Sequence, residues 1–300
     1  MGICARLKLL SFKSLPSAIP EPLAVIISQN PMKKISIHDN NEFLDFLNDK
    51  IDRNDFRYKY LIPVLDMVFG IGQVPITENT TIFTHEKSWV IYIETHGQLF
   101  LYGENFEIFI DELSEIISFQ NFKGFEIMGD YTLVYSLLEK KNITNYTVIK
   151  DRIFYSLNNT DKLTPSFNET KAENQDCDEI TQMMLDYYVE EYKGLRNKTV
   201  EQINPAIVEH INTNSIIINK ENNVIRAFCT INDPDIGIIY VKPEYRNQNI
   251  GKQLLSSASE QLFKQNGCCY LMTDLINEAS NKMCIDVGYF EIYKHTNIEL

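Results

Sequence analysis

The stretch DIGIIYVKPEYRNQNIGKQLL, residues 235–255, decides the fold, because it predicts a strand, a tight loop and a helix in immediate succession. The apolar run from Ile238 to Val241 is stopped by Pro243, and apolar residues recur from Ile250 onward at the spacing of one helix face. The first four N–H groups of a helix lack internal partners and carry the positive end of its dipole. Because the loop from Arg246 to Asn249 carries no acidic residue, this helix start suits a phosphate or pyrophosphate.

A second strand and a second helix follow. Gly267 is placed as a C-terminal helix cap, and Cys268 to Asp274 has the composition of a buried strand, so strand, helix and strand form a parallel crossover. Asn277 is a good N-cap and Gly288 a good stop for the next helix. The chain then returns as a strand from Tyr289 to Tyr293.

These segments resemble the acyl-CoA-binding motifs of the GNAT superfamily of N-acetyltransferases. The family's loop reads Arg or Gln, two residues, Gly, one residue, then Gly or Ala, and here it is Arg246-Asn247-Gln248-Asn249-Ile250-Gly251. Asn249 replaces the family's first glycine, and asparagine is the non-glycine residue that best tolerates positive φ. A second motif matches in order and spacing, with Cys284 at the family's tyrosine position: Thr273-Asp274-Leu275, Asn277, Ser280-Asn281, Met283 and Gly288-Tyr289.

The resemblance implies an α/β fold of the α+β type, with a mixed sheet, and acetyl-CoA as co-substrate. The pantetheine arm would lie where neighbouring strands diverge, and its amides would pair with the backbone of Ile239, Tyr240 and Val241. The phosphates would lie on the loop and the helix start, at Arg246, Asn247, Gln248, Asn249, Ile250, Gly251 and Lys252. Two asparagines have two interpretations each, and we favour a helix cap for Asn277 and a contact to pantetheine or acetyl for Asn281.

Acyl transfer to an amine requires a group that removes the amine's proton, and carboxylates near strand ends are the candidates. Asp274, at the end of its predicted strand, is the first choice as base. Glu190 and Glu191, on the helix predicted from Asp178 to Tyr192, come next. The alternatives are a capping role for Asp274 and a solvated helix face for the two glutamates.

The leaving thiolate needs a proton, and GNAT enzymes commonly supply it from a tyrosine hydroxyl. Cys284 occupies that position here, with Tyr289 and Tyr240 as substitutes. A cysteine on an inward helix face is more often inert packing than a proton donor. The backbone N–H of Val241 is the candidate to stabilise the negative charge that develops on the carbonyl oxygen.

The length of 300 residues predicts two domains. We expect an extension at residues 1–31, a degenerate GNAT-like α/β domain at 32–157, a polar linker at 158–174 and an acetyl-CoA-binding GNAT domain at 175–300. In residues 32–157 the order of predicted strands and helices is similar to that of the second domain, but no comparable loop motif occurs.

Composition narrows the function. A net charge of −13 argues against a nucleic-acid partner and suits a cationic amine, although solubility alone explains such acidity equally well. The 6 Cys and 5 His show no zinc-site spacing, so no metal is expected, and reduced thiols fit the cytoplasm. No stretch reaches the length of a membrane span. The sequence leaves the possibility of a homodimer open. Two functions remain: an N-acetyltransferase acting on a primary amine of a small molecule or protein, or a catalytically silent acyl-CoA-binding or interaction protein.

Overall fold

The computed structural model describes residues 32–70, 76–165, 169–194 and 196–300, so the extension expected at residues 1–31 lies outside the described residues. Met32–Leu300 form one compact unit. Its first half contains, in chain order, β1 (Lys33–Ser36), α1 (Asn40–Lys50), η1 (Phe56–Tyr58), α2 (Leu61–Leu65), η2 (Asp66–Gly70), β2 (Thr81–His85), β3 (Ser88–Glu94), β4 (Gln98–Glu104), η3 (Phe106–Phe109), α3 (Ile110–Ile116), η4 (Phe119–Phe122), β5 (Glu126–Asp130), α4 (Tyr131–Lys140) and β6 (Thr147–Leu157).

The second half repeats this alternation of strands and helices. It contains β7 (Glu169–Lys171), η5 (Asn174–Asp176), α5 (Cys177–Tyr192), α6 (Val200–Asn212), β8 (Ile216–Glu221), β9 (Val224–Asn232), β10 (Asp235–Val241), η6 (Pro243–Tyr245), α7 (Ile250–Asn266), β11 (Cys269–Asp274), α8 (Glu278–Val287) and β12 (Phe290–Glu299). The strand β7 lies inside the segment that the sequence suggests as a linker, and it pairs with β8.

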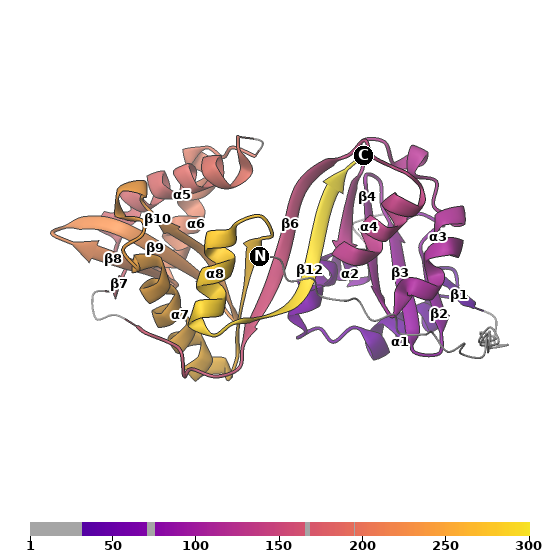
Figure 1. Ribbon diagram of the computed structural model, residues 1–300, viewed down its shortest axis with the longest axis horizontal. Helices are drawn as coiled ribbons and strands as arrows, with labels where there is room; N and C mark the ends of the chain where they lie inside the picture. Colours follow the sequence, from indigo (N-terminus) through magenta and orange to yellow (C-terminus); the bar gives the residue numbers. More distant parts are fainter. Residues whose placement is uncertain (1–31, 71–75, 166–168, 195) are drawn as a thin grey trace, which may run out of the picture. The chain divides into compact units, whose positions relative to one another are not determined.

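The strands form one mixed sheet in the order β1-β2-β3-β4-β5-β12-β6-β11-β10-β9-β8-β7, which confirms the predicted α/β class. The last strand of each half lies in the sheet of the other half. β6 pairs with β11, from Leu157 opposite Cys269 to Arg152 opposite Asp274, while β12 pairs with β5. β6 and β12 also pair with each other, and Figure 1 shows them side by side. The two halves are therefore joined by hydrogen-bonded strands.

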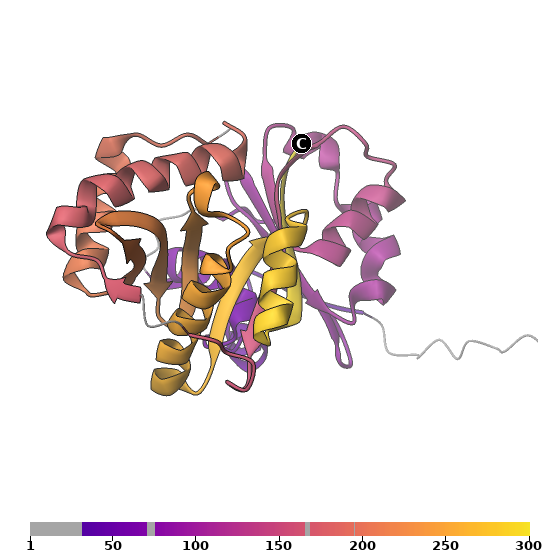
Figure 2. The ribbon, with the colours of Figure 1, turned by 60° about the vertical axis from the view of Figure 1, so that its left-hand side comes forward.

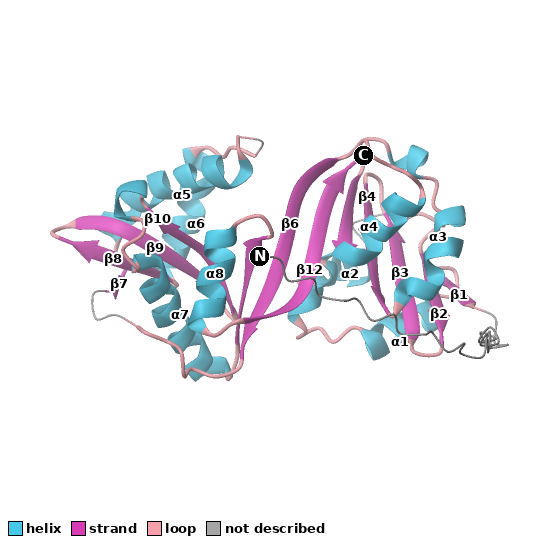
Figure 3. Ribbon diagram, viewed as in Figure 1, coloured by secondary structure: helices cyan, strands magenta, loops and turns pink. Residues whose placement is uncertain are grey.

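Helices cover both faces of the sheet, because alternate residues of each strand point to opposite faces. In the second half, α5 and α6 pack on one face and α7 and α8 on the other, as Figure 2 shows. In the first half, α1 and α2 cover one face and α3 and α4 the other, and Figure 3 separates these helices from the strands by colour. Each half thus has two hydrophobic cores, one on each side of its strands.

The α7 helix begins and ends as its sequence predicts. Asn249 precedes it with a φ of 61°, in the left-handed region that asparagine tolerates. Gly267 ends it with a φ of 69°, and its N–H bonds to the carbonyl of Phe263. The next helix, α8, is capped by the Asn277 side chain, which accepts a bond from the Ser280 N–H, and it stops at Gly288. Local residues therefore fix both helices that border the predicted ligand site.

Candidate active site

The strands β10 and β11 diverge after a short parallel pairing. They pair only at Asp235 with Tyr270 and at Ile236 with Leu271, and a bulge interrupts β10 between Ile236 and Ile239. Beyond that point β10 is bonded to β9 alone among the described strands. A gap therefore opens at the carboxyl ends of the two strands, where the sequence predicts the pantetheine arm.

Alternate residues of β10 are hydrogen-bonded to β9, and this alternation determines which backbone groups face the gap. The Lys242 N–H donates to the Arg226 carbonyl at 3.0 Å, and in an antiparallel pair the bonded residues alternate. Tyr240, two residues earlier and opposite Phe228, is therefore bonded to β9. Ile239 and Val241 turn their N–H and C=O groups toward β11, so two of the three predicted backbone contacts face the gap.

The loop before α7 leaves its backbone amides open. Asn247 and Asn249 both have a φ of 61°, and the Asn249 side chain makes no capping bond. No acidic residue lies in the first turn of α7. The first N–H groups of the helix consequently have no cap from Asn249 and no acidic residue in their own turn, which is an arrangement that anions favour.

A cavity of about 680 Å³ joins the strand gap, the start of α7 and the start of α8. It also reaches Glu190 and Glu191 on α5. Its lining includes most of the predicted residues: Ile239, Tyr240, Val241, Arg246, Asn247, Asn249, Ile250, Gly251, Lys252, Asp274, Asn277 and Cys284. Gln248, Asn281 and Tyr289 do not line it.

The Arg246 side chain folds back from the loop onto β10, the strand that precedes the loop. Its Nε donates to the Val241 carbonyl at 2.9 Å, its NH2 group lies 2.7 Å from Glu190 Oε2, and its guanidinium lies 5.5 Å from the centre of the Tyr240 ring. Glu190 Oε1 also accepts a bond from the Tyr240 hydroxyl at 2.9 Å. Arg246 therefore neutralises Glu190 and holds the loop against β10.

Asn281 is engaged within the protein. Its amide donates to the Leu275 carbonyl at 3.0 Å, and its carbonyl oxygen accepts from the Thr273 hydroxyl. It thus ties the end of β11 to α8, and it is not among the residues that line the cavity. The cap expected for Asn277 is present, and the contact of Asn281 with pantetheine or acetyl stays a prediction.

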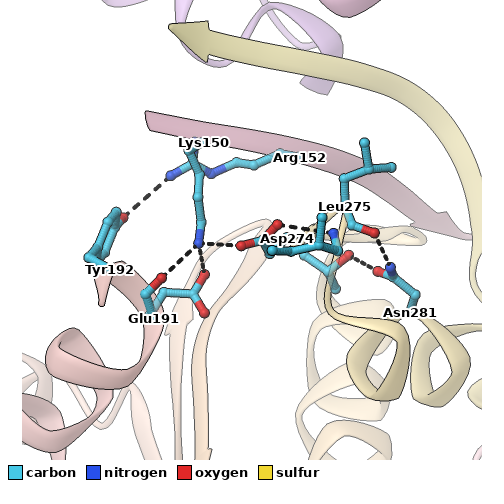
Figure 4. Close-up of polar contacts among 9 residues, drawn as sticks. Lys150, Arg152, Glu191, Tyr192, Asp274, Leu275 and Asn281 are labelled. Carbon is cyan, nitrogen blue, oxygen red and sulfur yellow. Dashed lines mark hydrogen bonds and ion pairs between the residues drawn. The ribbon is translucent and has the colours of Figure 1, made fainter. Parts of the chain in front are cut away.

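A lysine that the sequence did not single out lies beside Asp274. Lys150 of β6 is 5% exposed, and its Nζ lies 2.6 Å from Asp274 Oδ2 and 2.8 Å from Glu191 Oε1 (Figure 4). The other Asp274 oxygen accepts from the Ile276 N–H at 3.1 Å, which is the capping role weighed as an alternative. Asp274 is therefore both a loop cap and half of a buried ion pair. No local pattern marks Lys150, because it comes from the other half of the chain.

The predicted proton donors are buried. Burial raises the pKa of the Cys284 thiol to about 12, and this side chain is 1% exposed although it borders the cavity. Tyr289 is 2% exposed, and its hydroxyl lies 2.7 Å from Ser259 Oγ and 3.0 Å from Cys269 Sγ, in the core behind α7. Burial also raises the pKa of Tyr240. Tyr289 therefore has no access to the cavity, and Cys284 is a weak acid.

The described residues of the first half, 32–70 and 76–157, contain no equivalent site. Its strands β4 and β5 stay paired from Gln98 opposite Glu126 to Leu101 opposite Gly129. They approach so closely that a Cβ on Gly129 would lie 1.8 Å from the Leu101 carbonyl oxygen. The helix that follows β4 carries Asp111 and Glu112 in its first turn. Carboxylates at that position repel phosphate.

No helix within the described ranges is long and apolar enough to cross a membrane.

Comparisons with known proteins agree with this geometry. The acetyltransferase (GNAT) family matches residues 178–289, and a search of curated proteins finds no match. A GNAT-family acetyltransferase from Colwellia psychrerythraea is similar over 90% of this chain and 98% of its own, with 16% identity and a TM-score of 0.51. A GCN5-related N-acetyltransferase from Sphaerobacter thermophilus is similar over 79% of this chain and 84% of its own, with 12% identity and a TM-score of 0.49. A tandem GNAT protein from the clavulanic acid biosynthesis pathway is similar over 89% of this chain and 97% of its own, with 8% identity and a TM-score of 0.43.

The Colwellia structure shows that the fold of this chain, across both halves, occurs in a GNAT protein. The family match covers the strand gap, the loop and both helices that border the cavity. Residues 178–289 of the chain therefore match the acetyltransferase (GNAT) family, whose members are acyltransferases.

Proposed function

We propose that the chain transfers the acetyl group of acetyl-CoA to a primary amine by direct attack in a ternary complex. The observation that carries the proposal is the cavity that joins the β10–β11 gap to the open amides of α7. A cavity of about 680 Å³ lies within the range of small-molecule and cofactor sites.

The residues present fit acetyl-CoA. The backbone amides from Asn247 to Lys252 would hold the diphosphate, because they are open and no carboxylate lies in the first turn of α7. Ile239 and Val241 would pair with the pantetheine amides as an added strand does. The acetyl-CoA thioester would supply the activated acyl carbon, and the Val241 N–H would stabilise the developing oxyanion.

Proton transfer would use the carboxylates at the other end of the cavity. Asp274 and Glu191 together carry two negative charges, and Lys150 compensates one of them. One of these two carboxylates would accept the proton of the incoming ammonium, directly or through one water. A thiol with a pKa of about 12 is a weaker acid than an ordinary thiol, which has a pKa near 8.5, so Cys284 is a poor donor. The CoA thiolate would take its proton from water.

The test is release of free thiol from acetyl-CoA with a panel of primary amines. Amine-dependent thiol release, together with a product heavier by one acetyl group, is expected. Saturable acetyl-CoA binding without thiol release across a wide panel would contradict catalysis and would favour a silent acyl-CoA-binding protein.

A further inference from the structure

One face of β6 presents two cations beside Asp274 and Glu191, which line the cavity. Lys150 and Arg152 are two residues apart on one strand and so share a face of the sheet. Arg152 lies directly opposite Asp274 of β11, on the same face. The first half of the chain therefore places a lysine and an arginine beside the carboxylates of the second half.

The charge of Lys150 is compensated, but that of Arg152 is not. Lys150 forms ion pairs with Asp274 and Glu191. No described carboxylate forms an ion pair with Arg152, whose only polar partner in the described ranges is the Tyr192 hydroxyl at 3.4 Å. Figure 4 shows the guanidinium reaching toward that hydroxyl. An arginine with one weak polar contact keeps most of its donors available.

The surroundings of Arg152 hold its guanidinium without using its donors. The guanidinium lies 5.5 Å from the centre of the Tyr60 ring, and a cation over an aromatic face is stabilised electrostatically. None of its nitrogens is among the fully buried atoms that lack a partner. The N–H groups that Tyr192 leaves free consequently reach solvent, in the fork geometry that matches a carboxylate.

The balance of charge indicates the acceptor. Lys150 and Arg152 match Asp274 and Glu191 in number, and Arg246 neutralises Glu190. A bare ammonium would bring an excess positive charge beside Arg152. A zwitterion would meet both partners, with its ammonium at Asp274 and Glu191 and its carboxylate at Arg152.

We propose, on the basis of the acetyl transfer proposed above, that the acceptor is a small α-amino acid whose carboxylate is bound by Arg152. The amine nitrogen forms a bond to the acetyl carbon while the carbon–sulfur bond breaks. An amino acid ammonium and acetyl-CoA give an N-acetyl amino acid, free CoA thiol and one proton. Arg152 would determine which acceptors bind, because it contacts the carboxylate of the acceptor and not the reacting amine.

The experiment compares thiol release for matched pairs of an amino acid and the amine that remains without its carboxylate, such as alanine with ethylamine and phenylalanine with 2-phenylethylamine. The wild-type protein should prefer the amino acid by about tenfold or more in kcat/KM, since a charge-assisted hydrogen bond contributes at least that factor. Arg152→Met should raise KM for the amino acid by about tenfold or more and leave the decarboxylated amine unaffected. The KM of Arg152→Lys for the amino acid should lie between that of the wild type and that of Arg152→Met.

Two controls keep the outcomes separate. Arg53→Met removes an exposed arginine that pairs with Asp66 in the first half, and it should change neither substrate. Acetyl-CoA binding by Arg152→Met should match the wild type, which verifies that the variant is folded. If it is not folded, the wild-type preference for the amino acid over its decarboxylated partner decides alone.

Equal turnover of both members of each pair would overturn the inference and leave acetyl transfer to amines standing. A loss with Arg152→Met that is equal for both members would overturn it as well. Absence of thiol release with every amine, with or without a carboxylate, would refute the proposed function and this inference together.

Discussion

Lys150 Nζ and Asp274 Oδ2 lie 2.6 Å apart, although the two residues are 124 positions apart in the sequence and belong to different halves of the chain. The contact exists because β6 of the first half is the neighbour of β11 in the second. The side chains are 5% and 15% exposed. Removing one partner of such a buried pair leaves an uncompensated charge, which is far more destabilising than losing a surface pair.

Lys150→Met should therefore lower the free energy of unfolding by about 3–5 kcal/mol. Lys264→Met, which removes an exposed lysine paired with Glu260, should cost less than about 1 kcal/mol. Urea unfolding measures both changes, and equal losses for the two lysine variants would contradict the assigned pair.

The double variant Lys150→Met/Asp274→Asn provides a second measure of the same contact. It should lose less stability than the two single variants added together, since each single change strands a charge that the double change removes. Strict additivity would show that the two charges are not coupled.

His295 of β12 should make the protein sensitive to acid. It is fully buried, and burial, followed by the charge of Arg152, lowers its pKa to about 3. A base whose folded-state pKa lies below its unfolded value near 6.5 contributes stability above pH 6.5, and this stability is lost as the pH falls toward 3. Lowering the pH from 7 to 5 should cost about 2 kcal/mol through this residue. His295→Phe should reduce that dependence, and His96→Phe at an exposed position should not. Identical slopes for both variants and the wild type would contradict the assignment.

Cys284→Ala should retain thiol-release activity within about threefold of the wild type. A thiol whose pKa burial raises to about 12 stays protonated at neutral pH and donates poorly. A general acid typically contributes about 10²–10⁴-fold, so its removal would be unmistakable. Steady-state kcat is the measurement, with acetyl-CoA affinity as the check that the variant is folded. A loss of a hundredfold or more would restore Cys284 as the proton donor.

The second half alone should not form a stable domain. A fragment of residues 169–300 lacks β5 and β6, so β11 keeps only its short pairing with β10, and β12 loses both of its partners. Unpaired strand edges of this kind expose backbone groups and favour aggregation. Thermal unfolding followed by circular dichroism should show a cooperative transition for the full chain and none for the fragment. A cooperative fragment that binds acetyl-CoA would show that the exchanged strands are dispensable.

The parts of the fold that could be predicted from the sequence depend on local residues. Pro243 ends a strand, Asn249 adopts a left-handed turn and Gly267 ends a helix whatever their distant neighbours are. The strand gap, the open helix start and the Asn277 cap follow from such signals.

The remaining features depend on contacts between distant segments. The sequence of β6 is typical of a strand, but nothing in it specifies β11 as its neighbour, so neither the strand exchange nor Lys150 was foreseen. Tyr289 fits the family motif, yet its hydroxyl bonds to Ser259 and Cys269 because packing against α7 turns it inward. The short strand β7 is polar and has no sequence pattern typical of a strand. It is a strand because it pairs with β8.

The central claim, that the start of α7 holds the diphosphate of acetyl-CoA, is tested most directly by calorimetry with Gly251→Val. A Cβ at this position would lie 3.3 Å from Val241 Cγ2 and 3.4 Å from Met283 Sδ, so a branched side chain must intrude into the cavity. Wild-type protein should bind acetyl-CoA saturably, and Gly251→Val should weaken binding about tenfold or more with little change in unfolding midpoint. Lys264→Val, farther along the same helix, is the control. Unchanged affinity in Gly251→Val, or no heat on adding acetyl-CoA to the wild type, would contradict the claim.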